Sequence, residues 1–462
     1  MHCDVLSDFV AATAVKFDVP GVAVGVWAEG RESYACYGVT SVENPLTVDP
    51  RTLYVLGSVT KTYTATAIMR LAAQGRVDLD APVRRYIPEL VLPDKAAANA
   101  VTVLNLLNHT AGLDWRINID TGEGDDALAQ EVAKLAEVKL IAPPGSRASY
   151  SQAGYDLAGR IVEKVTGLTY ENAMASLLFG PLGLSHSFFA RDDVMTRRFA
   201  VGHNFGDDGK LHVAKPWRHW RSDNPGAGLA SSVTDQIRWA RFHLGGGRAE
   251  GGERILPAQA LHRMKEPTVA LRGSSLGDAF GICWFLRDVG GVRTVGHGGS
   301  ANGQFANLLI VPEGKFAVVT LSNAGPDSGL AFNQAVVRWA LDRYLGVVDR
   351  DPYPVPHDEA RASEITGRYE NEMMRLDIAS DGVGLTIECG IRPEVRAAAN
   401  GELPPNVPRA ELGLLPGNAD GFIVTSGGLR GQRGFFTRDD RGAVVGVDLA
   451  GRLFKRAPLL TE

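Results

Sequence analysis

The stretch that decides the fold is Leu53-Tyr54-Val55-Leu56-Gly57-Ser58-Val59-Thr60-Lys61, which leads into an apolar segment that ends at Gly75. Apolar residues recur there at roughly helical spacing, so the sequence predicts a helix that begins at Ser58. Residues three apart are neighbours on a helix surface, which places Lys61 over Ser58. Ser58 would then lie at the helix N-terminus, where free N–H groups favour developing negative charge.

Ser58 and Lys61 are the parts of an activated nucleophile. A serine hydroxyl needs an adjacent base to remove its proton, and a lysine serves as that base only when burial or a second cation lowers its pKa. One Ser-x-x-Lys pair is expected roughly by chance in a chain of this length, so the pair alone is weak. The simple alternative is a helix-capping serine beside a solvated lysine.

A second segment, Tyr150-Ser151-Gln152, follows the turn Pro143-Pro144-Gly145 and precedes a helix predicted over Tyr155–Thr166. A tyrosine on such a loop can project its hydroxyl into a cleft and relay a proton between Ser58, Lys61 and a leaving group. Gln152 is expected to donate an amide hydrogen bond to the substrate. The alternative for Tyr150 is a packed aromatic ring with a satisfied hydroxyl.

The third segment is Gly296-His297-Gly298-Gly299-Ser300, before a strand over Gln304–Val311 and its hairpin partner over Phe316–Leu321. Glycines beside His297 allow another backbone to approach, as an edge strand beside a substrate requires. A backbone N–H near Ser300 is expected to form an oxyanion hole with that of Ser58. The alternative is a histidine in a glycine-rich hairpin corner.

In this order the segments resemble the Ser-x-x-Lys, Tyr-x-Asn and Lys-Thr-Gly or His-x-Gly motifs of the penicillin-binding-protein and class C β-lactamase-like serine hydrolases. The resemblance extends to Gly21–Trp27, Leu107–Leu113 and Gly226–Ser232, and covers about residues 5–345. It implies that Ser58 is acylated, that Lys61 and Tyr150 are the acid–base pair, and that His297 stands in the substrate-side third motif.

Two residues depart from the family pattern. Gln152 replaces the usual Asn, so its amide reaches one methylene further, and His297 stands where the penicillin-processing members usually have Lys. An imidazole that is neutral at pH 7 attracts a substrate carboxylate less than an ammonium does. This favours esters or amides over β-lactams as substrates.

The chain is expected to contain two domains, because 462 residues exceed what one core usually holds. Residues 1–348 are predicted to be an α/β (α+β) catalytic domain, with an antiparallel sheet flanked by helices and an all-helical subdomain between Leu79 and Leu184. A helix over Gln334–Leu345 ends it, and residues 349–364 read as a linker. Residues 365–462 alternate as in a small all-β up-and-down barrel of about eight strands, and resemble the lipocalin-like domain attached to some of these hydrolases.

Rival motifs are weaker. Gly273–Gly277 fits Gly-x-Ser-x-Gly literally, but Phe280–Leu286 after it reads as a strand where the nucleophile elbow needs a helix. His203, His212 and His219 are irregularly spaced for a metal site, and no cofactor or metal is expected. Residues 203–224 read as a loop at the pocket rim.

Composition limits the partners. A net charge of −5 gives no reason to expect nucleic acid or a membrane surface as partner. The N-terminal segment has no basic region or continuous apolar core, so it reads as an amphipathic helix, and we expect a cytoplasmic protein with four reduced cysteines. A homo-oligomer is compatible with the sequence.

These observations predict a serine hydrolase that forms an acyl-enzyme on Ser58 and cleaves a small ester or amide, either a D-residue peptide or a carboxylic ester. One alternative is an acyltransferase or peptide macrocyclase in which an amine resolves the acyl-enzyme. Another, of a different class, is a non-catalytic ligand-binding homologue.

Overall fold

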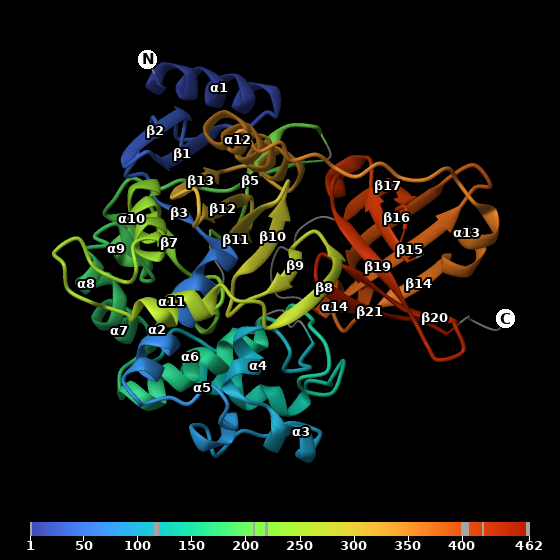
Figure 1. Ribbon diagram of the computed structural model, residues 1–462, viewed down its shortest axis with the longest axis horizontal. Helices are drawn as coiled ribbons and strands as arrows, with labels where there is room; N and C mark the ends of the chain where they lie inside the picture. Colours follow the sequence, from blue (N-terminus) through green and yellow to red (C-terminus); the bar gives the residue numbers. More distant parts are fainter. Residues whose placement is uncertain are drawn as a thin grey trace.

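The computed structural model describes residues 2–114, 120–206, 208–217, 220–398, 406–417 and 420–458. Its larger part is built on an eight-stranded antiparallel sheet (Figure 1). The strand order is β2 (Arg31–Gly38), β1 (Gly21–Ala28), β13 (Phe316–Ser322), β12 (Gln304–Val311), β11 (Val292–Ala301), β10 (Phe285–Val289), β9 (Gly277–Phe280) and β8 (Val269–Ser274). The predicted hairpin of β12 and β13 is confirmed, with Val311 opposite Phe316.

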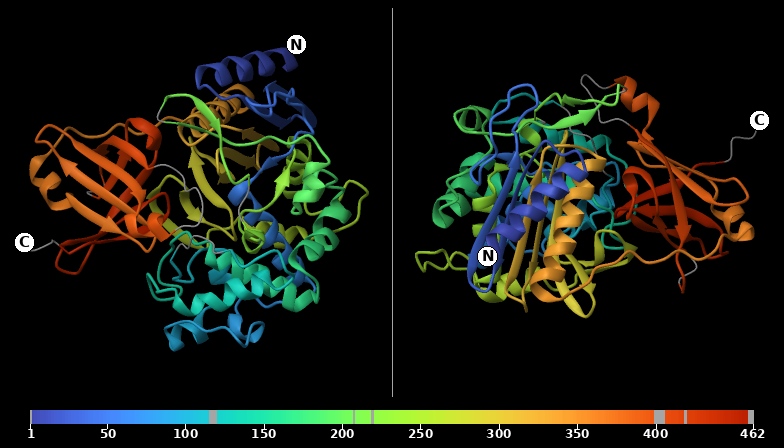
Figure 2. Two further views of the ribbon diagram at one scale, coloured as in Figure 1. Left: turned by 180° about the vertical axis from the view of Figure 1, so that it is seen from behind. Right: turned by 90° about the horizontal axis from the view of Figure 1, so that it is seen from above.

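Helices cover both faces of this sheet. On one face α1 (His2–Lys16) and α12 (Asp327–Leu345) lie side by side (Figure 2). They bury Leu6, Val10, Phe332 and Val336 against the outward residues of β1 and β13. On the other face α10 (Val233–Leu244) packs against inward residues of the same strands, and α2 (Thr60–Ala73) belongs to the same hydrophobic core. The predicted fold class, a sheet flanked by helices, is confirmed.

The predicted helical region lies beyond α2. It contains α3 (Lys95–Ala100), α4 (Val103–Leu107), α5 (Ala127–Ala133), α6 (Ala153–Thr166), α7 (Tyr170–Met174) and α8 (Gly180–Leu182). Helix α6 is strongly amphipathic and places Leu157, Ile161 and Val162 in the main core. Its end at Gly167 adopts φ 75°, the left-handed conformation that glycine permits.

Several local predictions need correction. Residues 280–286 do not form one strand: β9 ends at Phe280 and β10 starts at Phe285, because the chain turns at Cys283 with φ 75°. Helix α12 begins at Asp327, earlier than periodicity suggested. The segment over 203–224 contains a two-stranded hairpin, β5 (His203–Phe205) and β6 (Leu211–Val213).

The C-terminal part is a closed barrel of eight antiparallel strands, as predicted. The strands are β14 (Gly367–Glu370), β15 (Met374–Ser380), β16 (Leu385–Ile391), β17 (Val407–Leu414), β18 (Gly421–Val424), β19 (Arg433–Arg438), β20 (Val444–Leu449) and β21 (Arg452–Arg456). Pairing of Tyr369 with Arg456 closes it. Helix α14 (Pro393–Ala398) follows β16.

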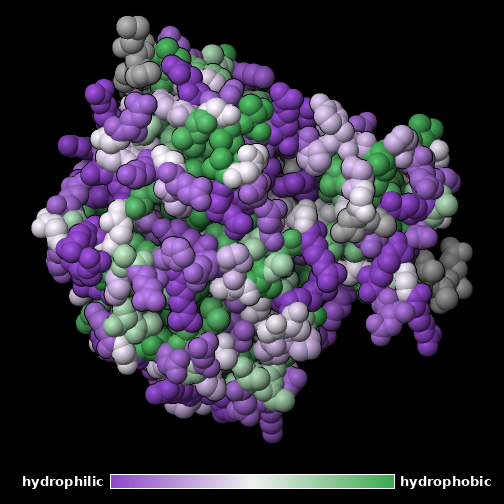
Figure 3. Space-filling model, in the orientation of Figure 1, coloured by the Kyte–Doolittle hydropathy of each residue, from purple (hydrophilic) through white to green (hydrophobic). Residues whose placement is uncertain are grey.

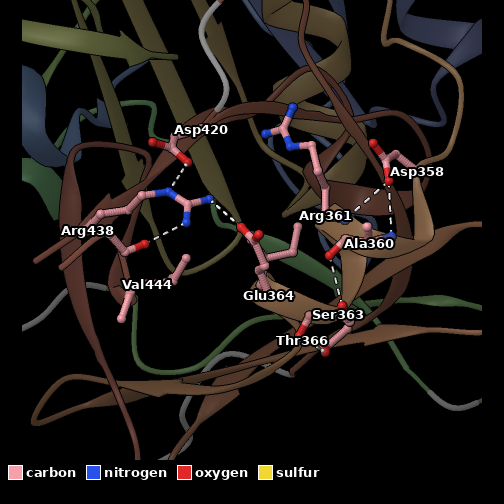
Figure 4. Close-up of polar contacts among 12 residues, drawn as sticks. Asp358, Ala360, Arg361, Ser363, Glu364, Thr366, Asp420, Arg438 and Val444 are labelled. Atoms are coloured by element: carbon pink, nitrogen blue, oxygen red, sulfur yellow. Dashed lines mark hydrogen bonds and ion pairs between the residues drawn. The ribbon is translucent and has the colours of Figure 1, made fainter.

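The expected linker 349–364 is partly helical and belongs with the barrel. Helix α13 (Glu359–Ile365) buries Ala362 and Ile365 in the barrel core. Arg438 of β19 bonds Glu364 at 2.8 Å and Asp420 at 2.9 Å, which fastens the helix to the strands (Figure 4). The residue numbers at which the chain divides into domains stay a prediction.

The barrel packs directly on the larger part, and the two form unequal lobes (Figure 3). Tyr150 donates its backbone N–H to the carbonyl of Gly451 at 2.7 Å, and Ser275 Oγ donates to Gln432 Oε1 at 2.6 Å. The cysteines with described side chains, Cys36, Cys283 and Cys389, are free thiols. None of the described helices is long and apolar enough to cross a membrane.

Candidate active site

Ser58 lies in a 3-10 turn, Gly57–Val59, that runs directly into α2. The predicted helix is therefore present, but its α-helical part starts at Thr60. Gly57 has φ 53°, and a Cβ there would lie 2.3 Å from the carbonyl oxygen of Ser300. Both the positive φ and the close approach of Ser300 require glycine at this position. Because Gly57 has no side chain, β11 can pack closely against the turn that carries Ser58.

Lys61 is buried beside Ser58, as the spacing predicted. Its Nζ lies 3.2 Å from Ser58 Oγ, 2.6 Å from Gln152 Oε1 and 2.8 Å from the carbonyl of Gly226. Burial is the main cause that lowers the pKa of Lys61 to about 8. In the neutral amine, the two carbonyl acceptors take the two N–H groups, so the lone pair faces the Ser58 hydroxyl.

Gln152 does not face the substrate side, which corrects the expected role. Its Nε2 donates to Asp223 Oδ1 at 2.7 Å and to Asp156 Oδ1 at 3.2 Å. An amide nitrogen has two hydrogens, so both are used within the protein. Gln152 therefore holds Lys61 from behind, and its amide is not placed to donate to a bound ligand.

Tyr150 is buried in the segment just before α6, and its Oη has no hydrogen-bond partner within bonding distance among the described residues. Burial raises the pKa of Tyr150, and the nearby Ser58 hydroxyl opposes this only in part. The phenol therefore keeps its proton at neutral pH, which suits a group that passes or donates a proton. Lys61 is the better base of the two, because its pKa is the one brought toward neutrality.

His297 is buried on β11 and stacked on Phe285, with ring centroids 4.2 Å apart. Its Nδ1 lies 2.6 Å from the carbonyl of Gly298; a carbonyl only accepts, so Nδ1 carries the hydrogen. Burial first, and the charge of Lys61 second, lower the pKa of His297 to about 3. The ring is therefore neutral, and its Nε2, without a partner among the described residues, is a hydrogen-bond acceptor.

The third segment lies at a free strand edge next to Ser58. Pairing of β10 with β11 stops at Gly296, so the edge beyond it carries no described strand partner on that side. A Cβ on Gly299 would lie 3.0 Å from the backbone nitrogen of Ser58, and one on Gly57 2.6 Å from that of Ser300. The two amide groups expected to form the oxyanion hole are thus brought together.

A cavity of about 1060 Å³ joins these groups. Ser58, Tyr150, His297, Gly298, Gly299 and Ser300 line it, whereas Lys61 and Gln152 lie behind its wall. Barrel residues, among them Gln432, Arg433 and Arg452, form part of its lining. The cavity is therefore shared between the sheet and the barrel.

Sequence reasoning missed three kinds of residue here. His109, quoted only within a resembling segment, lies against Tyr150 with ring centroids 4.3 Å apart and accepts the N–H of Ser151 on Nδ1 at 3.2 Å. Asp156 and Asp223 hold Gln152. Arg452 of the barrel lies over the Tyr150 ring at 5.1 Å. Asp156 could have been noticed in the sequence as an acidic residue on an apolar part of the helix after Tyr150. No local sequence signal indicates the roles of His109, Asp223 or Arg452.

The histidines considered for a metal do not gather. His203 Nδ1 bonds the carbonyl of Asn323 and its Nε2 accepts the N–H of Val42, while His212 bonds Asp208. His219 lies outside the described residues. In the parts of the chain that the structure describes, no three His, Cys, Asp or Glu side chains are grouped to hold a metal ion.

The fold and this constellation of Ser, Lys, Tyr and His define the class of serine hydrolases with the β-lactamase and transpeptidase architecture. A family model described as Beta-lactamase matches residues 6–341, and this chain belongs to that family. Penicillin-binding protein 4 of Amycolatopsis lactamdurans is 32% identical over 371 residues, 78% of this chain and 96% of that protein. A Beta-lactamase of Providencia stuartii is 30% identical over 52% of this chain and 59% of its own length.

Solved structures agree on the architecture. The crystal structure of SurE aligns with 98% of this chain and 99% of its own, with a TM-score of 0.75 and 25% identity, so the likeness includes the barrel. A class C beta-lactamase aligns with 73% of this chain and 95% of its own, with a TM-score of 0.61 and 23% identity. Together with the family match, these structures confirm the predicted resemblance to the penicillin-binding-protein and class C β-lactamase-like serine hydrolases.

Proposed function

We propose that this chain is a serine hydrolase that forms an acyl-enzyme on Ser58 and cleaves a small ester or an amide, such as a D-residue peptide or a carboxylic ester. The observation that carries the proposal is Lys61 Nζ, buried 3.2 Å from Ser58 Oγ with its pKa lowered to about 8. A nucleophile with a matched base in contact is the signature of covalent acyl transfer.

The reaction follows from these positions. Neutral Lys61 takes the Ser58 proton as Oγ attacks the substrate carbonyl, and the backbone N–H groups of Ser58 and Ser300 receive the oxyanion. Tyr150 passes the proton to the leaving alcohol or amine as the carbonyl–heteroatom bond breaks. Water then attacks the acyl group, gives a proton back through the same residues, and releases the acid and free Ser58.

His297 affects which substrates are accepted. Because the ring is neutral and its Nε2 accepts, the third motif offers no cation for a substrate carboxylate. It suits a substrate or leaving group that presents an N–H or O–H at this edge. This supports esters and amides over penicillins.

Transacylation is the second candidate. SurE, to which this chain is similar over 98% of its length, has also been solved with D-Leu, and a free amino acid carries the amine that transacylation needs as acceptor. In that case an amine, and not water, resolves the acyl-enzyme. A D-leucyl thioester offered with and without an amine acceptor separates the two: an amide product at the expense of free acid favours transfer.

Intact mass after brief exposure to a p-nitrophenyl ester, a penicillin, a D-alanyl thioester and a phosphonate tests the proposal, with wild type and Ser58→Ala side by side. We expect a single adduct on wild type alone, from the ester or thioester and the phosphonate. Ser328→Ala, at another serine of the cavity wall, is the matched control and keeps the adduct. The hydrolase proposal would be contradicted if Ser58→Ala were labelled as strongly as wild type. It would also be contradicted if wild type formed no adduct and Ser58→Ala bound ligand with unchanged affinity, and the non-catalytic binding protein would then be the better explanation.

A further inference from the structure

Behind Lys61 a single amide links the base to two buried carboxyl groups. Gln152 Oε1 accepts from Lys61 Nζ at 2.6 Å, while its Nε2 donates to Asp223 Oδ1 at 2.7 Å and Asp156 Oδ1 at 3.2 Å. The four side chains come from α2, from the residue before α6, from α6 itself and from the 3-10 turn Arg221–Asp223. Every distance lies within ordinary hydrogen-bond range.

The chain makes room for this longer amide. A Cβ on Gly226 would lie 1.6 Å from Gln152 Nε2, a separation that no side chain tolerates. The carbonyl of the same Gly226 is the second carbonyl acceptor of Lys61, at 2.8 Å. The glycine is therefore required by the space that the Gln152 amide occupies and not by a turn conformation.

We propose that Gln152, anchored on Asp156 and Asp223, is the positioning residue that aims Lys61 at Ser58 and keeps its nitrogen out of direct contact with the two carboxyl groups. The inference deepens the proposed function, and its kinetic part rests on it. A glutamine is suited to this task, because its carbonyl can face the lysine while both amide hydrogens face the acids. We expect that an amide one methylene shorter, as in Gln152→Asn, would not bridge Lys61 and the two acids from this backbone position.

Separation matters because a carboxylate in contact would keep the proton on the lysine. Burial lowers the pKa of Lys61, whereas Asp223 and then Asp156 raise it through their charge. Burial, Glu131 and Asp223 raise the pKa of Asp156, which makes Asp156 the smaller of the two charge effects on Lys61. With the amide between them, burial prevails and Lys61 titrates close to neutrality.

Titratable and charged groups from several elements of the described structure surround Lys61 and the two acids. The titratable and charged groups that face it or the two acids are Tyr150 and Tyr155 of the α6 region, Cys283 of the β9–β10 turn, His109 after α4, His297 of β11, Arg452 of β21 and Glu131 of α5. Of all charged groups near Lys61, Asp223 has the largest effect on the pKa of Lys61, so the experiment substitutes Asp223.

The experiment follows Lys61 directly and through catalysis in the full chain. The side-chain signal of Lys61 in ¹³C,¹⁵N-lysine-labelled protein, assigned by its loss in Lys61→Met, is titrated in wild type, Asp223→Asn and Gln152→Asn. The pH profile of kcat/KM on a p-nitrophenyl ester is recorded for the same proteins. Asp235→Asn is the matched control, because Asp235 is also buried but bonds His186 and Ser187 instead.

Asp223→Asn keeps an acceptor for Gln152 and removes charge, so we expect the Lys61 titration and the acid limb of kcat/KM to move down by about half a pH unit or more. Gln152→Asn is expected to lower kcat roughly tenfold or more with KM nearly unchanged, because the amine is no longer aimed at Ser58. Asp235→Asn moves neither quantity. A purely structural role for Gln152 would instead lower the melting temperature and leave kcat at the plateau as it is.

The two proposals fail separately. If Asp223→Asn leaves the Lys61 titration in place and Gln152→Asn turns over like wild type, the positioning inference is overturned while acylation of Ser58 still stands. If the titration shifts as expected but no probe acylates Ser58, the inference about Lys61 holds and the proposed hydrolase function is wrong.

Discussion

A solvent-exposed lysine is almost fully charged at pH 7 and well above it. Lys61 is fully buried, and its pKa is lowered to about 8. The lowered pKa gives a pH dependence with a defined sign. The neutral amine makes up about a tenth of the protein at pH 7 and half near pH 8, so kcat/KM is expected to rise about tenfold per unit below pH 8 and then level off. Ester hydrolysis between pH 5.5 and 9.5 checks this, and Lys61→Arg, which stays charged, should be inactive throughout. A flat profile would contradict Lys61 as the base.

Tyr150 gives a second prediction at the same scale. Its buried hydroxyl has no hydrogen-bond partner within bonding distance among the described residues, so Tyr150→Phe removes the proposed proton relay and only the weaker interaction with the Ser58 hydroxyl. We expect kcat to fall roughly 10²-fold or more, with a melting temperature equal to or above that of wild type. The measurement is steady-state hydrolysis together with calorimetry. Unchanged kcat would remove Tyr150 from the mechanism, and a large loss of stability would point to a structural role.

At the scale of elements, the contact between the 3-10 turn of Ser58 and strand β11 sets the position of the proposed oxyanion hole. Gly57 and Gly75 both adopt left-handed φ, of 53° and 71°, but only Gly57 has a neighbour that a Cβ would meet. Both glycine-to-alanine changes therefore carry the backbone cost of about 1–2 kcal/mol, and Gly57→Ala adds the clash with Ser300. Chemical unfolding measures the difference.

We expect Gly57→Ala to be less stable than Gly75→Ala and to lower kcat/KM on esters, since β11 must move away from Ser58. Gly75→Ala, at the far end of α2, should keep wild-type kcat/KM. Equal activity of the two variants would show that the distance between β11 and Ser58 does not control the reaction.

The same scale shows what local patterns predict well. The helix of Ser58 and Lys61, the hairpin of β12 and β13 and the strands of the barrel were predicted because each depends on periodicity within a short segment. The single strand over 280–286 was wrong, since its break at Cys283 is made by a hydrogen bond from Cys283 N to the carbonyl of Leu107, far away in sequence. No local signal distinguishes that residue.

At the scale of the whole molecule, the barrel completes the cavity and touches the Tyr150 segment. The backbone N–H of Tyr150 donates to the carbonyl of Gly451 and so joins the larger part to the barrel. Gly451 and Gly442 are both left-handed turn glycines of the barrel, with φ 71° and 83°. A Cβ on Gly451 would lie 2.5 Å from Leu276, whereas one on Gly442 meets nothing within 4 Å.

Gly451→Ala is therefore expected to displace the Leu276 side chain, which lines the cavity, and to change the ratio of kcat/KM between a short and a bulky ester at least about threefold. Gly442→Ala carries a similar backbone cost without the contact, and should keep the wild-type ratio. Parallel assays of the two variants on both esters measure this. Identical ratios would mean that the barrel has no part in substrate choice.

The sequence by itself determined the order of the parts: a nucleophile and base one helical turn apart, a tyrosine on a loop, a histidine between glycines, and a β-rich C-terminal part. These follow from spacing and alternation, which act over a few residues. Only the tertiary structure decided that Gln152 faces Asp156 and Asp223 and that a barrel arginine lies over Tyr150. The reason is physical: burial and charge at Lys61 come from side chains up to several hundred positions away, and their sum is set only when the chain is folded.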